Sequence, residues 1–181
     1  CNLNNIEWVI AVPHNIIGPR QKYDDPFRNV VSIMLNRMMQ KKAPIIYGDG
    51  EQKRCFSYID DCISCIEEAI INPKASKEVI NIGPDEEFIS IKDLADKCSN
   101  VTGFNTQHIY HKSRPQEVKF ATCSSNKARK ILGYKTKYNL DQSIELTYQY
   151  IKKRGAKDFD YQLDLEIINE KTPKTWKNKL I

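Results

Sequence analysis

The segment IEWVIAV, residues 6–12, is almost continuously apolar and is followed by Pro13. A strand with one face in water alternates apolar and polar residues, whereas a strand covered on both faces lacks that alternation. The segment therefore predicts a strand buried on both faces, which stops at Pro13 because proline has no N–H to donate to a neighbouring strand. The run begins close to a first residue that is not methionine, so we expect the chain to be a piece of a longer protein.

The rest of the chain has the composition of a folded domain. Its 181 residues, 40% hydrophobic and 28% charged with only seven glycines, predict a packed core in about one domain. No apolar run approaches the roughly 20 residues of a membrane helix, and the start has no signal-peptide pattern. The net charge of +5 is spread along the chain without a basic stripe, so it predicts neither a nucleic-acid nor a membrane partner.

Six cysteines stand at positions 1, 55, 62, 65, 98 and 123. Cys62 and Cys65 form a C-x-x-C spacing, but the surrounding pattern DDCISCIEEAI places them on or near the apolar face of a helix. No second C-x-x-C or H-x-x-x-H completes a zinc site, so we predict buried small side chains and no metal ligands. Metal binding or redox chemistry is the alternative. No disulfide is required, and a reducing cytoplasm is the simplest compartment.

Helical spacing and local signals predict five helices mixed with short strands, an α/β pattern without repeats. Asp60 or Asp61 is expected to cap the second helix, Ser90 the third and a serine the fourth, and Gly103 and Gly133 are expected to end the third and fourth. The helices are predicted within 26–42, 61–72, 90–103, 124–133 and 140–155. Strands are predicted within 44–48, 53–59, 78–83 and 107–111, and the tail from residue 156 is predicted to be irregular.

Arg20, Arg54 and Arg114 each stand beside a turn or a proline rather than on a helix face. The planar guanidinium group matches phosphate oxygens through paired hydrogen bonds, so two arginines converging from separate loops would suit a diphosphate. Asn15 could add an amide donor, and Tyr47 could place its ring against a nucleotide base. Spacing alone leaves ordinary surface salt bridges open as the alternative for each arginine.

Four motifs carry a family resemblance: PHNIIGPRQ, PIIYGDGEQKRCFSYIDD, VINIGPDEEFISIKDLA and SRPQEVKFATCSSNKARKILGY. In order and spacing they resemble the C-terminal half of the NAD-dependent epimerase/dehydratase family, which are extended short-chain dehydrogenases that act on nucleotide sugars. The similarity covers roughly residues 6–152, and UDP-glucose 4-epimerase is the member type that it most resembles. The resemblance implies an α/β fold: the C-terminal part of a Rossmann-type enzyme, with a small mixed α/β substrate-binding domain of short strands.

The resemblance divides the chain into three parts. Residues 1–25 would be the last part of the Rossmann domain, with a strand and the N-x-x-G-P loop, residues 26–155 the substrate-binding domain, and residues 156–181 a C-terminal extension. In the family, the N-terminal half binds NAD through a glycine-rich turn and reacts through a Y-x-x-x-K pair. This chain contains neither G-x-G-x-x-G nor Y-x-x-x-K. The intact protein is therefore expected to be an enzyme, with no catalytic residue in this chain and with NAD held mainly by the other half.

The resemblance also assigns binding roles to individual residues. Pro13 and His14 match positions beside the nicotinamide of NAD. The remaining matches bind the nucleotide sugar: Asn15, Arg54 and Arg114 at the diphosphate, Asn29 and Val30 at the phosphates and nucleoside, Ile45 and Tyr47 along the base, and Glu117 at the ribose hydroxyls. The Gly-Asp-Gly turn at 48–50 is expected to fold strand 44–48 back onto strand 53–59, so that Tyr47 and Arg54 hold one ligand.

The expected function is the substrate-binding part of an NAD-dependent epimerase that acts on a UDP-hexose at C4, in a cytoplasmic homodimer. Binding the far end of the substrate in this way would position the sugar for reaction at the cofactor. One alternative is a dehydratase or decarboxylase of the same family acting on a GDP-, dTDP- or UDP-sugar. The other is a stand-alone, non-catalytic nucleotide-sugar-binding module, which the lack of Y-x-x-x-K favours.

Overall fold

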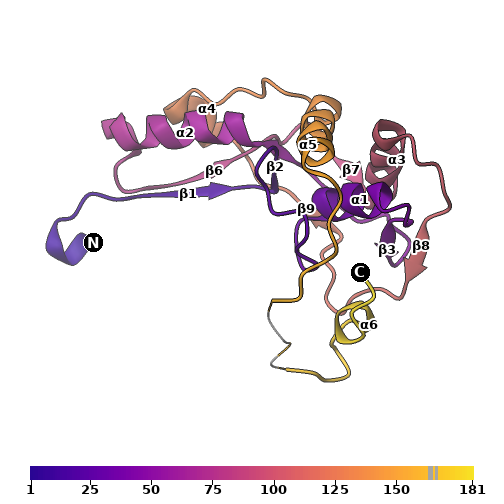
Figure 1. Ribbon diagram of the computed structural model, residues 1–181. Coiled ribbons are helices and arrows are strands. Elements are labelled where there is room, and N and C mark those ends of the chain that lie inside the picture. Colours follow the sequence, from indigo (N-terminus) through magenta and orange to yellow (C-terminus); the bar gives the residue numbers. More distant parts are fainter. Residues whose placement is uncertain (163–164, 166) are drawn as a thin grey trace.

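The computed structural model describes residues 1–162, 165 and 167–181 and has a mixed α/β fold, as the sequence predicts (Figure 1). The helices are α1 (Val30–Met39), α2 (Ile59–Ile71), α3 (Ile91–Thr102), α4 (Asn126–Leu132), α5 (Leu140–Arg154) and α6 (Lys174–Lys177), with 3-10 turns η1 (Asn2–Asn4) and η2 (Pro73–Ala75). The strands are β1 (Val9–Pro13), β2 (Ile16–Ile17), β3 (Ile45–Tyr47), β4 (Lys53–Arg54), β5 (Ser57–Tyr58), β6 (Glu78–Ile82), β7 (Ile89–Ser90), β8 (Ile109–His111) and β9 (Phe120–Ala121). Within these described residues, no helix is both long and apolar enough to cross a membrane.

The N-terminal part of the fold is an arm in which β1 and β6 pair in parallel, with Ile10 opposite Val79 (Figure 1). Helices α2 and α4 cover one face of this two-stranded sheet and bury the side chains that point toward them. The buried residues of this arm cluster are Cys62, Cys65, Ala69, Ala75, Ile80, Ile82, Ala128, Leu132 and Tyr134. The prediction that Cys62 and Cys65 are small buried side chains is confirmed.

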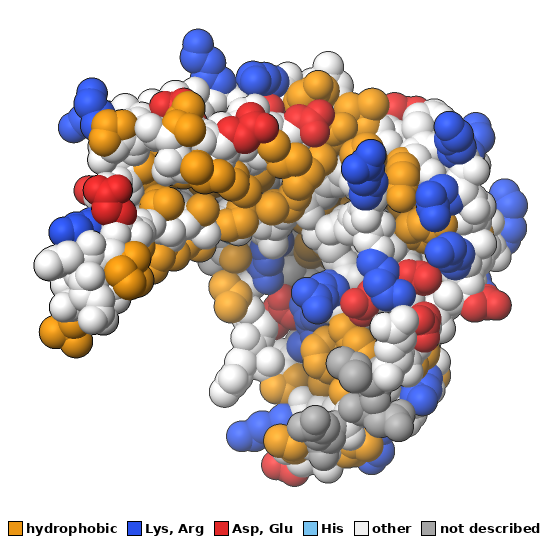
Figure 2. Space-filling model, turned by 60° about the vertical axis from the view of Figure 1, so that its left-hand side comes forward, with side chains coloured by type: hydrophobic (Ala, Val, Ile, Leu, Met, Phe, Trp, Pro, Cys, Tyr) orange, Lys and Arg blue, Asp and Glu red, His pale blue; other side chains and the backbone are white. Residues whose placement is uncertain are grey.

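The other face of the arm sheet is open, so the prediction of a strand buried on both faces is wrong for the residues described. Side chains alternate along β1, and those on the open face are Ile10 and Val12, which are 50% and 42% exposed. Val79 on β6 is 48% exposed beside them. The physical reason is that no described helix packs there. Figure 2 shows hydrophobic side chains gathered on this arm, and the molecule is hollowed beneath it.

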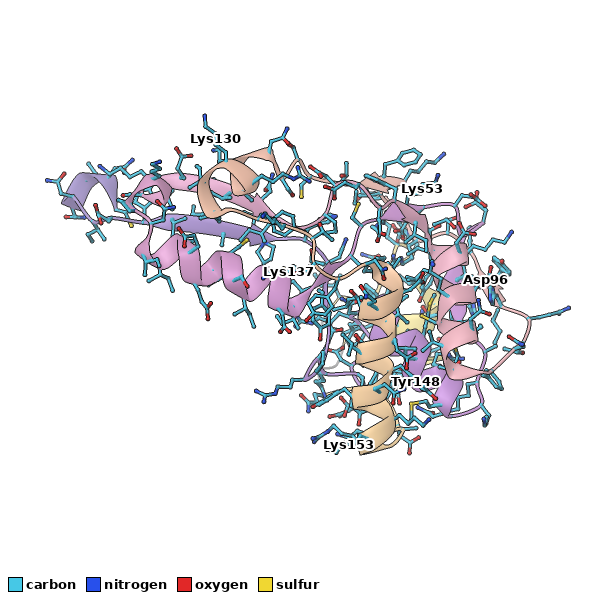
Figure 3. All side chains as sticks on the ribbon, turned by 90° about the horizontal axis from the view of Figure 1, so that it is seen from above. Lys53, Asp96, Lys130, Lys137, Tyr148 and Lys153 are labelled. Atoms are coloured by element: carbon cyan, nitrogen blue, oxygen red, sulfur yellow. The ribbon has the colours of Figure 1, made fainter. Side chains whose placement is uncertain are left out.

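A second core lies between α1, α3 and α5, which contact one another. Seen from above, α3 and α5 lie side by side, with Asp96 on the first and Tyr148 on the second (Figure 3). The buried residues of this helical cluster are Ile17, Tyr23, Val31, Met34, Leu35, Met38, Ile46, Phe56, Ile89, Ile91, Leu94, Ala95, Cys98, Leu140, Ile144 and Ile151. The short strands also contribute apolar residues to this core, on the side where the connecting loops lie.

Local signals account for the ends of these three helices. Asn29 caps α1 by accepting a hydrogen bond from Val31 N at 3.2 Å, so the helix begins at Val30, four residues after Pro26. Ser90 caps α3 as predicted, and Gly103 ends it in the left-handed conformation with φ of 67°. Asn139 caps α5 in a reciprocal capping box. All five predicted helices are therefore present.

The predicted hairpin around the Gly-Asp-Gly turn is wrong. Strand β3 pairs in parallel with β8, whereas β4 lies between β7 and β9, so the turn carries the chain from one sheet to another. The predicted strand 53–59 also breaks in two. Asn15 accepts Ser57 N at 3.2 Å through its backbone carbonyl and donates its side-chain amide to Cys55 O at 2.9 Å, and these bonds direct β5 to β2.

Two predicted caps are also wrong. Neither Asp60 nor Asp61 caps α2, whose N-cap position is Tyr58 without a side-chain bond. Asp61 is buried and instead accepts the backbone N–H groups of Lys137 and Tyr138 at 3.1 and 3.4 Å, which ties the loop before α5 to α2. Ser125 does not cap α4, because its hydroxyl donates to the carbonyl of Gly83 in the arm.

The tail is partly regular, contrary to prediction. Helix α6 forms after Pro173, whereas the described residues between α5 and α6 form no regular element; residues 163, 164 and 166 lie outside the described part. The predicted division at residues 25 and 155 stays a prediction.

Removing the cap of α3 tests the account of the helical core. Ser90 Oγ accepts Asp93 N at 3.0 Å in a nearly buried position, so Ser90→Ala should lower the free energy of unfolding by about 1 kcal/mol. The control is Ser64→Ala, whose exposed hydroxyl only bonds back within α2; its effect should stay within about 0.5 kcal/mol. Urea denaturation measures both, and equal values for the two variants would contradict the capping role.

Candidate functional site

One cavity of about 340 Å³ lies where the helical core meets the loops of the mixed sheet and the C-terminal segment. It brings together every residue that was predicted to bind substrate: Asn15, Asn29, Val30, Ile45, Tyr47, Arg54, Arg114 and Glu117. These residues come from segments up to 102 positions apart (117 minus 15). Residues that are far apart in the sequence therefore lie together on one concave surface.

A carboxylate bridges the two arginines of this cavity. Arg54 Nη2 donates to Glu117 Oε1 at 2.8 Å, and Arg114 Nε donates to Glu117 Oε2 at 2.6 Å. The side chains of Arg54 and Glu117 are each 16% exposed and that of Arg114 is 35% exposed. Two positive charges and one negative charge leave the group with a net charge of +1. Such a partly desolvated cation pair favours an anionic ligand.

The backbone explains why these three side chains meet. Arg54 ends β4, the middle strand of the three-stranded sheet. Arg114 and Glu117 lie in the loop between β8 and β9, where Glu117 N donates to Arg114 O at 3.3 Å to form a tight turn. Gln116 takes φ of 57° within this turn. The arginine of the strand and the acid of the loop are therefore held in register by the pairing of β4 with β9.

Tyr47 ends β3 and lines the cavity beside Arg114. The guanidinium carbon of Arg114 lies 4.7 Å from the centre of its ring, a cation–π contact that covers one ring face. The Tyr47 hydroxyl pairs with Thr175 Oγ1 of α6, and burial raises the pKa of Tyr47. Packing of the base along Tyr47 stays a prediction.

The two predicted asparagines bond to the protein backbone in different ways. Asn29 uses both ends of its amide, because Nδ2 donates to Ile16 O at 3.0 Å while Oδ1 caps α1. Asn15 donates Nδ2 to Cys55 O. Since Asn29 and Val30 line the cavity at the start of α1, the positive end of that helix dipole lies at the cavity wall, where it favours phosphate.

Pro13 and His14, the predicted cofactor residues, lie outside the cavity. They stand at the carboxyl end of β1, and His14 N donates to Ile82 O at 2.9 Å at the carboxyl end of β6. Burial lowers the pKa of His14, and the charge of Arg54 lowers it further. Open α/β sheets bind ligands outside the carboxyl ends of their strands. The carboxyl end of β1 is therefore a suitable place for the predicted contact with nicotinamide, which stays a prediction.

Sequence reasoning missed several residues that line the cavity, among them Phe27, Gln52 and Trp176. Gln52 donates Nε2 to Tyr47 O at 3.0 Å, and this bond connects the two ends of the Gly-Asp-Gly turn and fixes the end of β3. The aromatic content of the tail was a signal for Trp176, but its position depends on contacts far away in sequence. Arg20, by contrast, is exposed and does not line the cavity.

None of the six cysteines lines the cavity, although the backbone carbonyl of Cys55 accepts the bond from Asn15. Burial raises the pKa of Cys62 to about 11 and that of Cys98 to about 12. The part of the chain that the structure describes contains no group of three or more His, Cys, Asp or Glu side chains placed to hold a metal ion.

The buried thiols should be unreactive in the folded protein. Brief treatment with N-ethylmaleimide should modify exposed Cys1 and leave Cys62, Cys65 and Cys98 unmodified, because burial both blocks access and disfavours the thiolate. Peptide mass spectrometry measures the labelling, and treatment in denaturant should label every cysteine as a control. Labelling of Cys98 as fast as Cys1 in the folded state would contradict the burial described.

Comparisons with known proteins place the chain among nucleotide-sugar enzymes. A family model described as GDP-mannose 4,6 dehydratase matches residues 2–147. A putative UDP-glucose 4-epimerase of Methanocaldococcus jannaschii is 34% identical over 155 residues, which are 84% of this chain and 48% of the relative. The chain thus spans about half the length of this curated relative.

Two solved structures share the fold. The crystal structure of UDP-glucose 4-epimerase with UDP-glucose from Thermotoga maritima has a TM-score of 0.77 at 28% identity, over 82% of this chain and 47% of that one. UDP-glucuronic acid 4-epimerase from Bacillus cereus, in complex with UDP-glucuronic acid and NAD, has a TM-score of 0.73 at 34% identity, over 81% of this chain and 45% of that one. The chain therefore belongs to the NAD-dependent epimerase/dehydratase family of nucleotide-sugar enzymes.

Proposed function

We propose that this chain is the C-terminal, nucleotide-sugar-binding half of an NAD-dependent epimerase that acts on a UDP-hexose, as UDP-glucose 4-epimerases do. The observation that carries the proposal is the cavity in which Arg54 and Arg114 converge on Glu117. The family and the UDP-sugar complexes of its relatives support the same substrate class.

The charges of the cavity suit a nucleoside diphosphate. The hydrogen bonds that Arg54 and Arg114 make to described residues use only some of the N–H donors of each guanidinium group, so donors remain for phosphate oxygens. The net charge of +1 and the start of α1 add to the attraction. An ionised carboxylate has about four acceptor sites, so Glu117 can keep its bonds to both arginines and still accept from the ribose hydroxyls, the role that the family resemblance gives it.

The reacting sugar would lie toward the carboxyl end of the arm sheet. Asn15 connects the two regions, because it lines the cavity and its Nδ2 lies 3.4 Å from His14 Nε2. Pro13 and His14 would lie beside the nicotinamide of NAD, whose chemistry there would be reversible hydride transfer. The residues of this chain would bind and orient: the energy of holding the diphosphate fixes the sugar at the carboxyl end of the sheet.

The other half of the enzyme would cover the open face of the arm. Parallel strands are normally buried on both faces, yet Ile10, Val12 and Val79 are exposed here. An N-terminal half carrying the glycine-rich turn and the Y-x-x-x-K pair would bury these side chains and supply the catalytic groups. We propose that the intact enzyme is a cytoplasmic homodimer.

A dehydratase of the same family is the second candidate, which the match to the GDP-mannose 4,6 dehydratase model favours; a decarboxylase would use the same substrate end. A stand-alone binding module is less well supported, because such a module would leave the apolar face of the arm sheet in water.

Replacing Arg54 tests the proposal directly. Because hydrogen bonds to charged groups contribute about 1.5–3 kcal/mol each, Arg54→Ala should weaken binding of UDP and of inorganic pyrophosphate at least about tenfold. Isothermal titration calorimetry on this chain measures both ligands. Arg154→Ala, at an exposed arginine in the last turn of α5, is the matched control and should bind as the parent does. Equal UDP affinity in Arg54→Ala and the parent would remove Arg54 from the site.

A further inference from the structure

The C-terminal segment, residues 156–181, is fixed to α1 at its start. Asn36 is fully buried in the middle of α1, and its amide donates to Lys157 O at 2.9 Å and accepts Lys157 N at 3.0 Å. Tyr23 donates its hydroxyl to Gly155 O at 3.0 Å, and Asp160 N donates to Asp24 O at 2.8 Å. A buried side-chain amide whose two ends are satisfied by one backbone position sets the register of the segment.

The end of the segment lies beside its beginning. Tyr161 donates its hydroxyl to Ile181 O at 3.2 Å and accepts Ile181 N at 3.3 Å, which joins the two ends of the segment. Between them, α6 holds Thr175 almost fully buried against the Tyr47 hydroxyl. Residues from this segment therefore form a wall of the cavity rather than a loose tail (Figure 1).

Trp176 is the large aromatic residue of that wall. Its ring lies 5.5 Å from the ring of Phe27 with an angle of 90° between the planes, and Tyr161 lies 5.9 Å from Phe27 at 88°. An edge-to-face pair leaves ring surface uncovered, and both Phe27 and Trp176 line the cavity. Trp176 is only partly buried, so some of its ring remains accessible to a ligand.

The cavity is thus lined by both charged and aromatic side chains. Arg54, Arg114 and Glu117 supply the charges, and Phe27 and Trp176 are an aromatic pair in contact with each other. A nucleotide has the same division into charged phosphates and a planar base, and bases stack well on aromatic side chains. The family model matches residues 2–147, so Phe27 lies within the matched part and Trp176 lies outside it.

We propose that Trp176 is a nucleotide-binding residue, against which the base of the bound nucleotide packs. This inference rests on the proposed function, because it takes the ligand of the cavity to be a nucleoside diphosphate. It assigns the C-terminal segment the task of recognising the base, while Arg54 and Arg114 hold the phosphates.

The test compares ligands with and without a base. In calorimetric titrations, Trp176→Ala should weaken UDP binding about tenfold, the size of one base–aromatic contact, and leave binding of inorganic pyrophosphate within about twofold. Trp176→Phe keeps an aromatic ring against Phe27, so its affinity for UDP should lie between those of Trp176→Ala and the parent. The matched control is Trp8→Ala, because Trp8 lies before β1, donates to Asn2 Oδ1 at 2.9 Å and does not line the cavity.

Fluorescence gives a readout that does not remove Trp176. In the variant Trp8→Phe, Trp176 is the sole tryptophan of the chain, and titration with UDP should change its emission while pyrophosphate should not. Unchanged emission at saturating UDP would overturn the inference, as would an equal loss of UDP and pyrophosphate binding in Trp176→Ala.

The outcomes separate the inference from the proposed function. If Arg54→Ala weakens both ligands and Trp176→Ala weakens neither, the phosphate site stands and the base contact is wrong. If Trp176→Ala weakens UDP and Arg54→Ala weakens neither ligand, the base contact stands and the arginine site is wrong. A parent chain that binds neither UDP nor pyrophosphate would overturn both.

Discussion

The ion pairs of Glu117 with Arg54 and Arg114 connect the parts of this molecule on which its function depends. They join the end of β4 to the loop between β8 and β9, and Arg114 in turn lies over Tyr47 at the end of β3. Two arginines placed this close without an acid between them would repel each other in a partly buried site. The carboxylate therefore holds the two guanidinium groups together, and the three side chains have a net charge of +1.

Much of the helical framework could be predicted because its signals are local. Ser90, Gly103 and Gly133 each act on residues within a few positions of themselves, and the structure places all three as helix caps, as predicted. The set of site residues came from the family resemblance, and the structure gathers the predicted substrate residues around one cavity. Their individual ligand contacts remain predictions.

The errors arise where distant segments decide the outcome. Asp61 has the sequence position of a helix cap, yet its carboxylate accepts hydrogen bonds from the backbone N–H groups of Lys137 and Tyr138 instead. The predicted hairpin is wrong because the strands that pair with β3 and β4 lie much later in the sequence. Trp176 was missed because its place depends on Asn36 holding the segment 121 positions later. No local pattern encodes such contacts.

The central claim is that the diphosphate of a nucleotide binds between Arg54 and Arg114. The most direct measurement is a crystal structure of the chain with UDP. The account predicts phosphate oxygens within hydrogen-bonding distance of both guanidinium groups, with the uracil ring against the wall formed by Trp176 and Phe27. UDP bound elsewhere on the molecule, with the Glu117 bridge intact and the cavity free of ligand, would contradict it.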